Sequence, residues 1–387
     1  MDFELSEEYK MLKDSVHDFM TKEIEPIAEQ IDREDKFPEW VWKRMGELGW
    51  LGITIPEEYG GSGFDYLAQA IVGEEMGRIC PALALSAGAH SNLCCDNLYR
   101  NGTEEQRHKY LPPLCRGEKV GALALTEPNA GSDAVGIQTT AKKDSDHYII
   151  NGTKMFITNG DIADTLIVYT KTDPQKGARG ITAFIVEKGF QGSFTSRHLE
   201  KMGYRGSPTA ELSFEDYRVP RQNILGEENQ GIRVMMSGLD AERAIFCGLG
   251  IGIAERALEL SLKYAKERVQ FRQPISNFQL IQGKLADMYT ALEASRLLTY
   301  KATTLAQKLE GGGKGTEIHK VAAAAILFNA EAATKAALDA VQIHGGYGYM
   351  LDYPINRLFR DAKLGEIGAG TSEIRRIVIA EALLEEV

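Results

Sequence analysis

Two stretches about thirty residues apart carry groups suited to holding a flat, polar ring. Residues 123–133 combine a short apolar run with a proline-containing turn and small residues, and residues 155–160 end a β-rich stretch. Together they expose backbone N–H groups and the hydroxyls of Thr126, Ser132 and Thr158. A planar ring with many hydrogen-bonding edges would fit such a surface. An ordinary β-turn has the same composition, so these residues alone leave both interpretations open.

Three further segments combine charged residues with glycines. Residues 238–243 (GLDAER) open a long helical stretch, residues 345–349 read GGYGY, and RLFRDA at 357–362 precedes IGAGTSE at 367–373. In isolation, Glu242 in the first segment would be interpreted as a solvated helical side chain paired with a neighbour.

Other glycine-rich stretches lack the context for nucleotide binding. Residues 248–252 (GLGIG) have the spacing of a dinucleotide loop, but no strand precedes them and they lie in a helical pattern, so we expect tight helix packing. Residues 313–316 (GKGT) are not a P-loop, because Gly-Lys is not followed directly by Ser or Thr. The seven histidines show no HExxH pattern or paired metal-ligand spacing, so we expect no metal.

Taken together, these motifs resemble those of the acyl-CoA dehydrogenase family of FAD flavoproteins. The resemblance covers essentially the whole chain, and TEPNAGSD, ITNG, GGYGY, RDAK and GTSEIRR in this arrangement are highly specific. It implies an enzyme that removes an α proton and a β hydride from an acyl-CoA thioester, giving a 2-enoyl-CoA. The hydride goes to the flavin N5, and a carboxylate takes the proton on the opposite face of the acyl chain. Electrons would then pass to an electron-transfer flavoprotein.

The resemblance places the catalytic base at Glu242. The common subgroup of the family has a glutamate directly before the Gly-Thr of the last motif, where this chain has Ala369. In the isovaleryl-CoA branch the base lies in a Leu-Asp-x-Glu-Arg motif, which residues 239–243 match. The absence of a carboxylate at Ala369 is consistent with a base at Glu242 instead. A glutamate in a dry pocket should have a raised pKa.

The same resemblance implies the remaining site residues, position by position. We expect FAD contacts at Leu123, Leu125, Thr126, Gly131, Ser132, Phe156, Ile157 and Thr158, and at Thr371, Ser372 and Glu373, where the N–H groups of the last helix suit a diphosphate. Arg268, Gln279, Gln342, Gly345 and Gly346 match residues that reach the FAD of a neighbouring subunit, which implies a homotetramer built as a dimer of dimers. Substrate contacts are expected at Ser132, Ala178, Arg179, Arg233, Asp240, Arg243, Leu85, Gly368, Ala369 and Gly370.

Two positions depart from the family pattern, and others bear on the substrate. Phe156 stands where many relatives have tryptophan, and Arg233 where the isovaleryl-CoA branch has tyrosine, which puts that CoA contact in doubt. Gly368 replaces a bulky residue of straight-chain enzymes and, with Ala369, leaves room for a branched or compact acyl group. A few methylenes change binding by only about 1–3 kcal/mol, so isovaleryl-CoA is the first choice and other branched, cyclic or longer acyl-CoAs stay open.

Two alternatives of other classes also stay open. One is an oxidase on the same fold that passes electrons to oxygen. The other is a non-catalytic helical scaffold, against which Glu242 argues.

Helices at both ends of the chain and strands between them must position these residues. Apolar residues at spacings of three and four predict a helical domain over 1–119, and short β-rich runs predict an antiparallel barrel or sandwich over 120–229. Long helices near 231–268, 277–310 and 316–344, with a last one at about 371–386, predict a four-helix bundle over 230–387. We therefore expect an α+β fold of three domains.

Local signals predict finer features of these domains. Pro26 should kink the first helix, and Pro112-Pro113 should end another. A turn is expected at 144–146, and Asn151-Gly152 is a strong hairpin signal.

The composition is that of an ordinary soluble globular protein, with 43% hydrophobic and 26% charged residues. A net charge of −11 argues against nucleic acid as a partner. The five cysteines form no CxxC pair, which favours free thiols in a reducing compartment. No signal peptide and no membrane-spanning run is visible, so we expect a cytoplasmic protein or, for a processed eukaryotic chain, one of the mitochondrial matrix.

Overall fold

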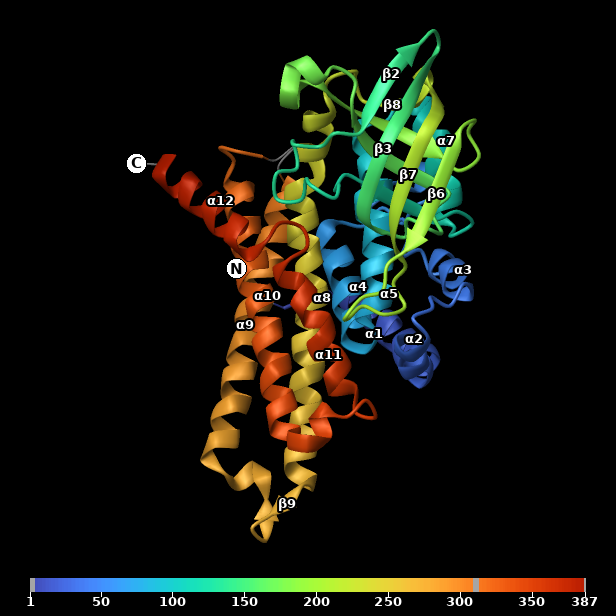
Figure 1. Ribbon diagram of the computed structural model, residues 1–387. Helices are drawn as coiled ribbons and strands as arrows, with labels where there is room; N and C mark the ends of the chain where they lie inside the picture. Colours follow the sequence, from blue (N-terminus) through green and yellow to red (C-terminus); the bar gives the residue numbers. More distant parts are fainter. Residues whose placement is uncertain (1–3, 309–312, 386–387) are drawn as a thin grey trace.

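The computed structural model describes residues 4–308 and 313–385. Helices occupy both ends of the described chain, and one large sheet lies between them in sequence (Figure 1). This order confirms the α+β fold expected from the sequence.

The N-terminal part is a set of short helices joined by tighter and wider turns. They are α1 (Glu7–Phe19), η1 (Met20–Ile24), η2 (Glu25–Ile27), α2 (Ala28–Glu34), α3 (Trp40–Glu47), η3 (Glu57–Tyr59), α4 (Tyr66–Ile79), α5 (Pro81–Gly88), η4 (Ala89–Asp96), α6 (Asn97–Asn101) and α7 (Glu104–Cys115). The predicted distortion at Pro26 is confirmed, because this residue lies in η2 between the wider turn η1 and α2.

The prediction that Pro112-Pro113 ends a helix is wrong, because α7 continues to Cys115. A proline lacks its own N–H but keeps a carbonyl acceptor, and the Pro112 carbonyl accepts a hydrogen bond from the N–H of Arg116 at 3.2 Å. The helix therefore completes its last turn around the two prolines.

The sheet contains β1 (Gly121–Ala124), β2 (Thr140–Asp144), β3 (His147–Thr158), β4 (Thr165–Lys171), β5 (Ile181–Glu187), β6 (Ser193–His198), β7 (Thr209–Pro220) and β8 (Ile224–Leu225). Its strand order is β6-β7-β3-β2-β4-β5-β8, with β1 on β4. The short helices η5 (Pro174–Gly180) and η6 (Arg221–Asn223) lie between strands of this part.

The expected antiparallel pairing of this sheet needs one correction. Strand β1 pairs in parallel with β4, and β2 touches β4 in parallel, so the sheet is mixed and is not a closed barrel. A parallel pair needs a crossover connection, and the β2–β3 hairpin supplies it between β1 and β4. Parallel and antiparallel strands can show the same alternation of apolar residues, so the sequence pattern could not predict that β1 and β4 pair in parallel.

The turn at 144–146 is confirmed, with Ser145 in a left-handed conformation (φ 55°). The hairpin at Asn151-Gly152 is wrong, because both residues lie inside β3. Gly152 (φ 147°) instead marks a shift in the register between β3 and β7. A Cβ atom there would lie 2.5 Å from the Thr139 hydroxyl oxygen. Glycine at this position therefore allows the two chain segments to approach each other closely.

The C-terminal part contains α8 (Gly231–Glu267), β9 (Val269–Gln270), β10 (Gln273–Pro274), η7 (Ile275–Asn277), α9 (Gln279–Lys308), α10 (Glu317–His344), η8 (Gly345–Tyr349), α11 (Pro354–Ala362), η9 (Lys363–Glu366) and α12 (Ser372–Glu385). The three long helices are confirmed. Helix α11 was not expected; it packs against α8 and α10, while α12 packs against α10 and points away from the long helices (Figure 1).

Tight packing between α8 and α4 confirms the interpretation of the glycines at 248–252. A Cβ atom on Gly248 would lie 2.1 Å from the Ala70 carbonyl oxygen, and one on Gly252 would lie 2.1 Å from that of Glu74. These glycines let the two helix backbones approach each other closely. The long helix α8 is thereby fixed to the N-terminal part of the chain.

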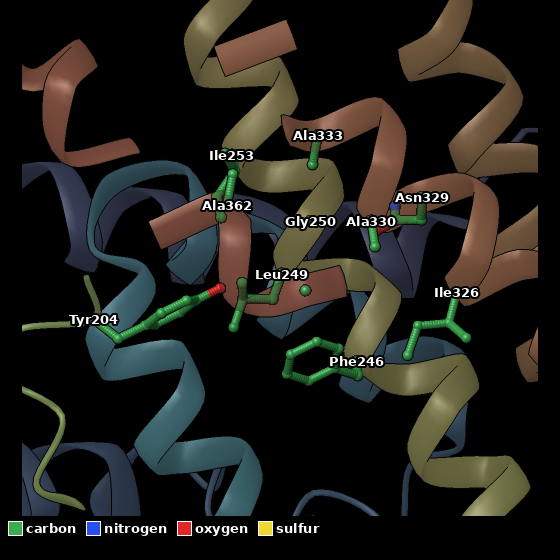
Figure 2. A pocket seen from close by; sticks show the side chains of 11 residues that line it. Tyr204, Phe246, Leu249, Gly250, Ile253, Ile326, Asn329, Ala330, Ala333 and Ala362 are labelled. Atoms are coloured by element: carbon green, nitrogen blue, oxygen red, sulfur yellow. The ribbon is translucent and has the colours of Figure 1, made fainter. Parts of the chain in front are cut away.

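A small cavity between α8, α10 and the segment where α11 leads into η9 has an interior of about 10 Å³ and is lined by residues that include Phe246, Gly250 and Asn329 (Figure 2). That is close to the room one water needs, so it is no acyl-chain site.

By length and composition, Glu317–Tyr349 is the one stretch among the described residues that could cross a membrane. Half of its most apolar window is buried, and the core helix of a soluble protein passes the same test. The absence of a membrane span therefore stays a prediction.

Candidate active site

The Glu242 carboxylate lies on α8 among apolar residues. Its side chain is mostly buried, and within the described part of the chain it has no hydrogen bond or ion pair. Burial raises the pKa of Glu242 to about 7, while the guanidinium groups of Arg243 and Arg375 act in the opposite direction. A carboxyl group with a pKa near neutrality is suited to general base catalysis at physiological pH.

The loop that carries position 369 lies beside the same turn of α8. Ala369 packs against an apolar cluster that includes Ala241 and Ile245. A Cβ atom on the next residue, Gly370, would lie 3.8 Å from Nη2 of Arg243. The structure therefore brings the last motif next to the turn that carries the carboxylate.

The two stretches expected to face a flat ring also lie together. The N–H of Met155 donates to the Thr126 carbonyl oxygen at 2.8 Å, which joins the loop after β1 to the end of β3. Leu123, Leu125, Thr126 and Thr158 are each partly exposed there, and Gly131 and Ser132 are exposed in the same loop. This arrangement leaves hydroxyls and loop backbone available to a ligand.

Phe156 is the most unusual residue of this surface. Its side chain is 66% exposed and its backbone is left-handed (φ 62°), at a second register shift between β3 and β7. A bulky residue in that conformation is strained, and such strain is concentrated at functional sites. Ile157, by contrast, is buried in the sheet core, so its side chain is not part of the exposed surface.

A buried ion pair that the sequence interpretation missed supports this surface from below. The Lys154 ammonium is fully buried, donates to Glu127 Oε1 at 2.7 Å and donates to the Leu125 carbonyl at 3.0 Å. Glu127 also accepts the N–H groups of Gln138 and Thr139. The sequence offers little signal for it, because Lys154 stands between Thr153 and Met155 with no apolar alternation around it.

The pKa values of this pair follow from burial and mutual attraction. Burial lowers the pKa of Lys154 to about 8, although Glu127 opposes the change. Burial alone would raise the pKa of Glu127, but the Lys154 ammonium and the N–H groups hold it below its ordinary value. Because Lys154 also donates to the Leu125 carbonyl, this charged pair holds the loop that carries Thr126 in place.

The last motif forms the start of α12. The N–H of Ile374 donates to the Thr371 hydroxyl at 3.3 Å, and Glu373 is exposed in the first turn. Ser372 is 4% exposed, and its hydroxyl has no partner within the part of the chain that the structure describes. An unpartnered hydroxyl at a helix start suits an anion.

Some of the residues expected to contact CoA lie near the start of α8, and others are buried along it. Ala178 and Arg179 lie in η5, which packs against α8, and Arg233 is exposed in the first turn of α8. Arg243 is 4% exposed, and its Nε has no partner among the residues described. Leu85 is partly buried on α5, which also packs against α8.

Asp240, which is expected to contact CoA, already has partners within the chain, and its contact with CoA stays a prediction. It is 2% exposed, and its carboxylate accepts from the Gly313 N–H at 2.7 Å and contacts Nδ1 of His319 at 2.8 Å and Nη1 of Arg243 at 3.3 Å. Its oxygens are thus already used to join α8 to the start of α10. A position in a motif does not reveal such partners.

A third set of expected cofactor residues lies far from the ring-facing surface. Arg268 stacks over the Tyr347 ring at 5.4 Å, which places it beside the exposed residues Gly345 and Gly346. Gln279 and Gln342 are exposed at the same end of the long helices, near β9, whereas the sheet lies toward their other end (Figure 1). One chain therefore does not bring all the expected FAD contacts together.

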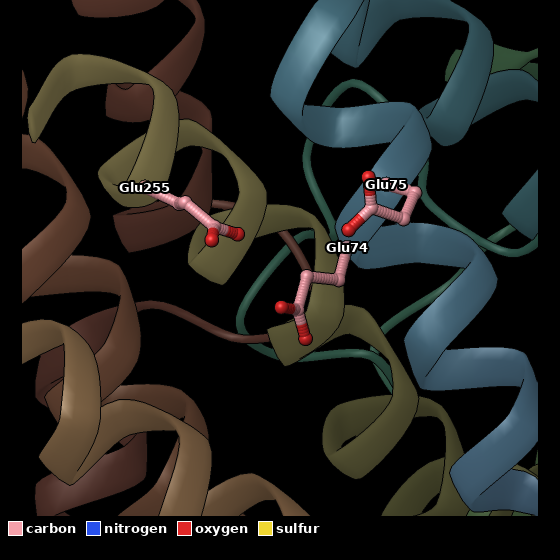
Figure 3. A group of neighbouring side chains, drawn as sticks. All are labelled: Glu74, Glu75 and Glu255. Carbon is pink, nitrogen blue, oxygen red and sulfur yellow. The ribbon is translucent and has the colours of Figure 1, made fainter. Parts of the chain in front are cut away.

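One carboxylate cluster has the geometry of a metal site but is occupied by cations of the chain. Oxygens of Glu74, Glu75 and Glu255 lie within 4.8 Å of one another (Figure 3). Arg296 contacts Glu74 at 2.9 Å and Glu255 at 2.7 Å, and Lys13 contacts Glu74 at 3.1 Å. The cluster is an ion network that joins α1, α4, α8 and α9.

The fold and this site, with its buried carboxylate, are those of an FAD-dependent oxidoreductase. Family models for the N-terminal, middle and C-terminal domains of acyl-CoA dehydrogenase match residues 6–118, 122–217 and 229–384. The chain belongs to the acyl-CoA dehydrogenase family.

Individual relatives are similar along nearly their whole length. A mitochondrial isovaleryl-CoA dehydrogenase of Pongo abelii is 51% identical over 98% of this chain and 89% of its own. A mitochondrial 2-methylacyl-CoA dehydrogenase of Solanum tuberosum is 48% identical over 98% and 92%. The butyryl-CoA dehydrogenase structure from Megasphaera elsdenii has a TM-score of 0.95 at 41% identity, covering 99% of this chain and 100% of its own.

Removing the Lys154 ammonium should destabilise the protein strongly. Lys154→Met leaves Glu127 buried without its cation, which should lower the free energy of unfolding by about 3–5 kcal/mol. The double variant Glu127→Gln with Lys154→Met should recover much of that loss, since no net charge is then buried. Urea unfolding followed by circular dichroism measures both, with exposed Lys142→Met as the control. Wild-type stability of Lys154→Met would contradict the assigned role of the pair.

Proposed function

We propose that the substrate is a short branched-chain acyl-CoA, with isovaleryl-CoA the first choice. The observation that carries this proposal is the pairing of positions 242 and 369, a dry carboxylate at the first and a methyl group at the second. Gly368 and Ala369 add little side-chain volume beside the turn of Glu242, which supports a compact or branched acyl group. The similarity to an isovaleryl-CoA dehydrogenase supports the same substrate.

In this proposal Glu242 removes the α proton of the bound thioester. FAD, when bound, supplies the acceptor for the β hydride. The surrounding apolar residues exclude water, and this exclusion raises the pKa of Glu242 toward the value at which proton transfer is efficient. The 2-methylacyl-CoA relative keeps a second branched substrate class open.

We infer that FAD lies over the surface formed by Thr126, Phe156 and their neighbours, with its diphosphate near the start of α12. The exposed, strained Phe156 and the buried, unpartnered hydroxyl of Ser372 fit such a cofactor. Exposed Arg179 and Arg233 near the start of α8 are available to the anionic part of CoA.

We further infer that two chains complete each FAD site. Arg268, Gln279 and residues 342–346 lie at the end of the long helices remote from the sheet, which supports contacts with the cofactor of a neighbour. The resemblance to the family supports a homotetramer, an electron-transfer flavoprotein as electron acceptor, and a cytoplasmic or mitochondrial-matrix location.

A substrate panel tests the proposed reaction. The purified protein should be yellow, and isovaleryl-CoA added without oxygen should bleach the flavin faster than 2-methylbutyryl-CoA, butyryl-CoA or a cyclic acyl-CoA. Stopped-flow absorbance measures each rate, and an artificial electron acceptor gives the steady-state values. A preference for butyryl-CoA would contradict the proposed substrate, and rapid peroxide formation in air would favour an oxidase.

Glu242→Gln should abolish flavin reduction but not binding. The amide keeps the size and polarity of the side chain but cannot accept the proton, so the reduction rate should fall by about 10²–10⁴-fold. In the wild type, the rate should rise with pH and level off above about 7, because only the ionised carboxylate accepts a proton. FAD content and acyl-CoA titration serve as controls. Reduction at the wild-type rate would place the base elsewhere, with Asp96 and Glu366 the next candidates.

Arg268→Ala should weaken FAD retention while the fold stays intact. A guanidinium that faces a diphosphate makes charge-assisted hydrogen bonds that a methyl group cannot replace. Flavin absorbance after gel filtration measures the loss, and light scattering should show four chains for the wild type. Exposed Lys263→Ala, on the same helix end, is the matched control. A wild-type protein that is an FAD-loaded monomer would overturn the two-chain site.

A further inference from the structure

Arg375, in the first turn of α12, is a fully buried cation with neutral partners. Its exposure is 0%, and its guanidinium donates to the carbonyl oxygens of Gly365 at 2.8 Å and Gly368 at 2.6 Å. Its Nε has no partner, and no carboxylate lies within ion-pair distance among the residues that the structure describes. A buried charge without a counter-ion is costly. Helix packing alone would be served better by an apolar side chain.

The two hydrogen bonds fix the loop that leads into the last motif. The Gly368 carbonyl and the N–H of Ala369 belong to one planar peptide unit, so holding the carbonyl orients both groups. Ala369 (φ 53°) and Gly370 (φ 91°) follow in left-handed conformations. Such a backbone persists at a non-glycine residue only where the surroundings hold it, and Arg375 provides two of those constraints.

The charge of Arg375 also acts on Glu242. Among the described residues, Glu242 interacts electrostatically with Arg243 on its own helix, Arg375 from α12 and the Tyr169 phenol from β4. Arg243 is partly neutralised by Asp240, whose oxygen lies 3.3 Å away.

The charge of Arg375 is neutralised less than that of Arg243, because no carboxylate among the described residues forms an ion pair with it. Cys247 and Arg243 face it from α8, Glu331 from α10 and Glu366 from η9, and none of them forms an ion pair with it. Burial lowers the pKa of Arg375 to about 10, so it stays charged at neutral pH.

We propose that Arg375 is a positioning residue for catalysis: it holds the 365–370 loop beside Glu242 and supplies the fixed positive charge that favours the ionised carboxylate. The inference rests on the proposed function, because it takes Glu242 as the base. It differs from a structural role in a measurable way. A purely structural arginine would change stability without changing the pH at which the base titrates.

The test compares Arg375→Gln and Arg375→Lys with Arg376→Gln. Arg376 is the neighbouring residue of α12, is exposed and pairs with Glu331, so its substitution removes a charge of the same helix without touching the loop. Flavin reduction by isovaleryl-CoA is followed by stopped flow from pH 5.5 to 9.5, with FAD content and thermal unfolding as checks on folding.

Arg375→Gln should raise the apparent pKa of the reduction rate by about one unit, which is a tenfold slower reaction below that pKa and a near-normal rate at high pH. Arg375→Lys keeps the charge but not the paired hydrogen bonds, so its pH profile should stay near the wild type while KM for the acyl-CoA rises. Arg376→Gln should match the wild type in both.

An unchanged pH profile in folded Arg375→Gln, with Glu242→Gln inactive, would overturn the role of Arg375 and leave the proposed base intact. A fully active Glu242→Gln would instead overturn the proposed function. If Arg375→Gln does not fold, Arg375→Lys decides: a pH profile shifted like that of a neutral variant, or an unchanged KM, overturns the inference.

Discussion

The proposed reaction needs Glu242 to be ionised, although burial opposes its ionisation, and the rest of this structure depends on that constraint. Glu242 satisfies both demands because α8 removes it from water while two arginines lie close enough to favour its charge. Neither arginine pairs directly with it, so the carboxylate keeps the freedom to take a proton. The loop before α12, the tie of Asp240 to α10 and the packing of α4 all fix the surroundings of this one group.

The sequence predicted much of this architecture because its strongest signals are local. Apolar spacing defined the long helices α8, α9 and α10, and the GLGIG stretch was correctly assigned to helix packing rather than to a nucleotide loop. One error was local, because α7 continues through Pro112-Pro113, and the other two occurred where separate segments of the chain meet. Asn151-Gly152 has the composition of a turn, but the approach of Thr139 determines its conformation, and the direction in which β1 pairs with β4 leaves no trace in the pattern of either strand.

The candidate site likewise contains residues that sequence motifs could identify and residues that only the folded structure identifies. Glu242 could be singled out by its motif, and the structure adds its burial and its perturbed pKa. Lys154 and Arg375 could not be singled out, because a lysine in a strand and an arginine in a helix are ordinarily exposed, and only the folded chain shows each one buried against backbone carbonyls. For Asp240 the motif position predicts a ligand contact, and the structure adds that its oxygens also contact Gly313 and His319.

The glycines at 248 and 252 have a consequence for how this part of the chain can vary. They allow α8 to lie against the backbone of α4, and Glu242 is on the same rigid helix less than two turns from Gly248. Any side chain at either glycine would act as a spacer and push the helix outward, carrying the carboxylate with it toward solvent. The absence of a side chain at these two glycines therefore sets how deeply the Glu242 carboxylate is buried, from the face of α8 that packs against α4.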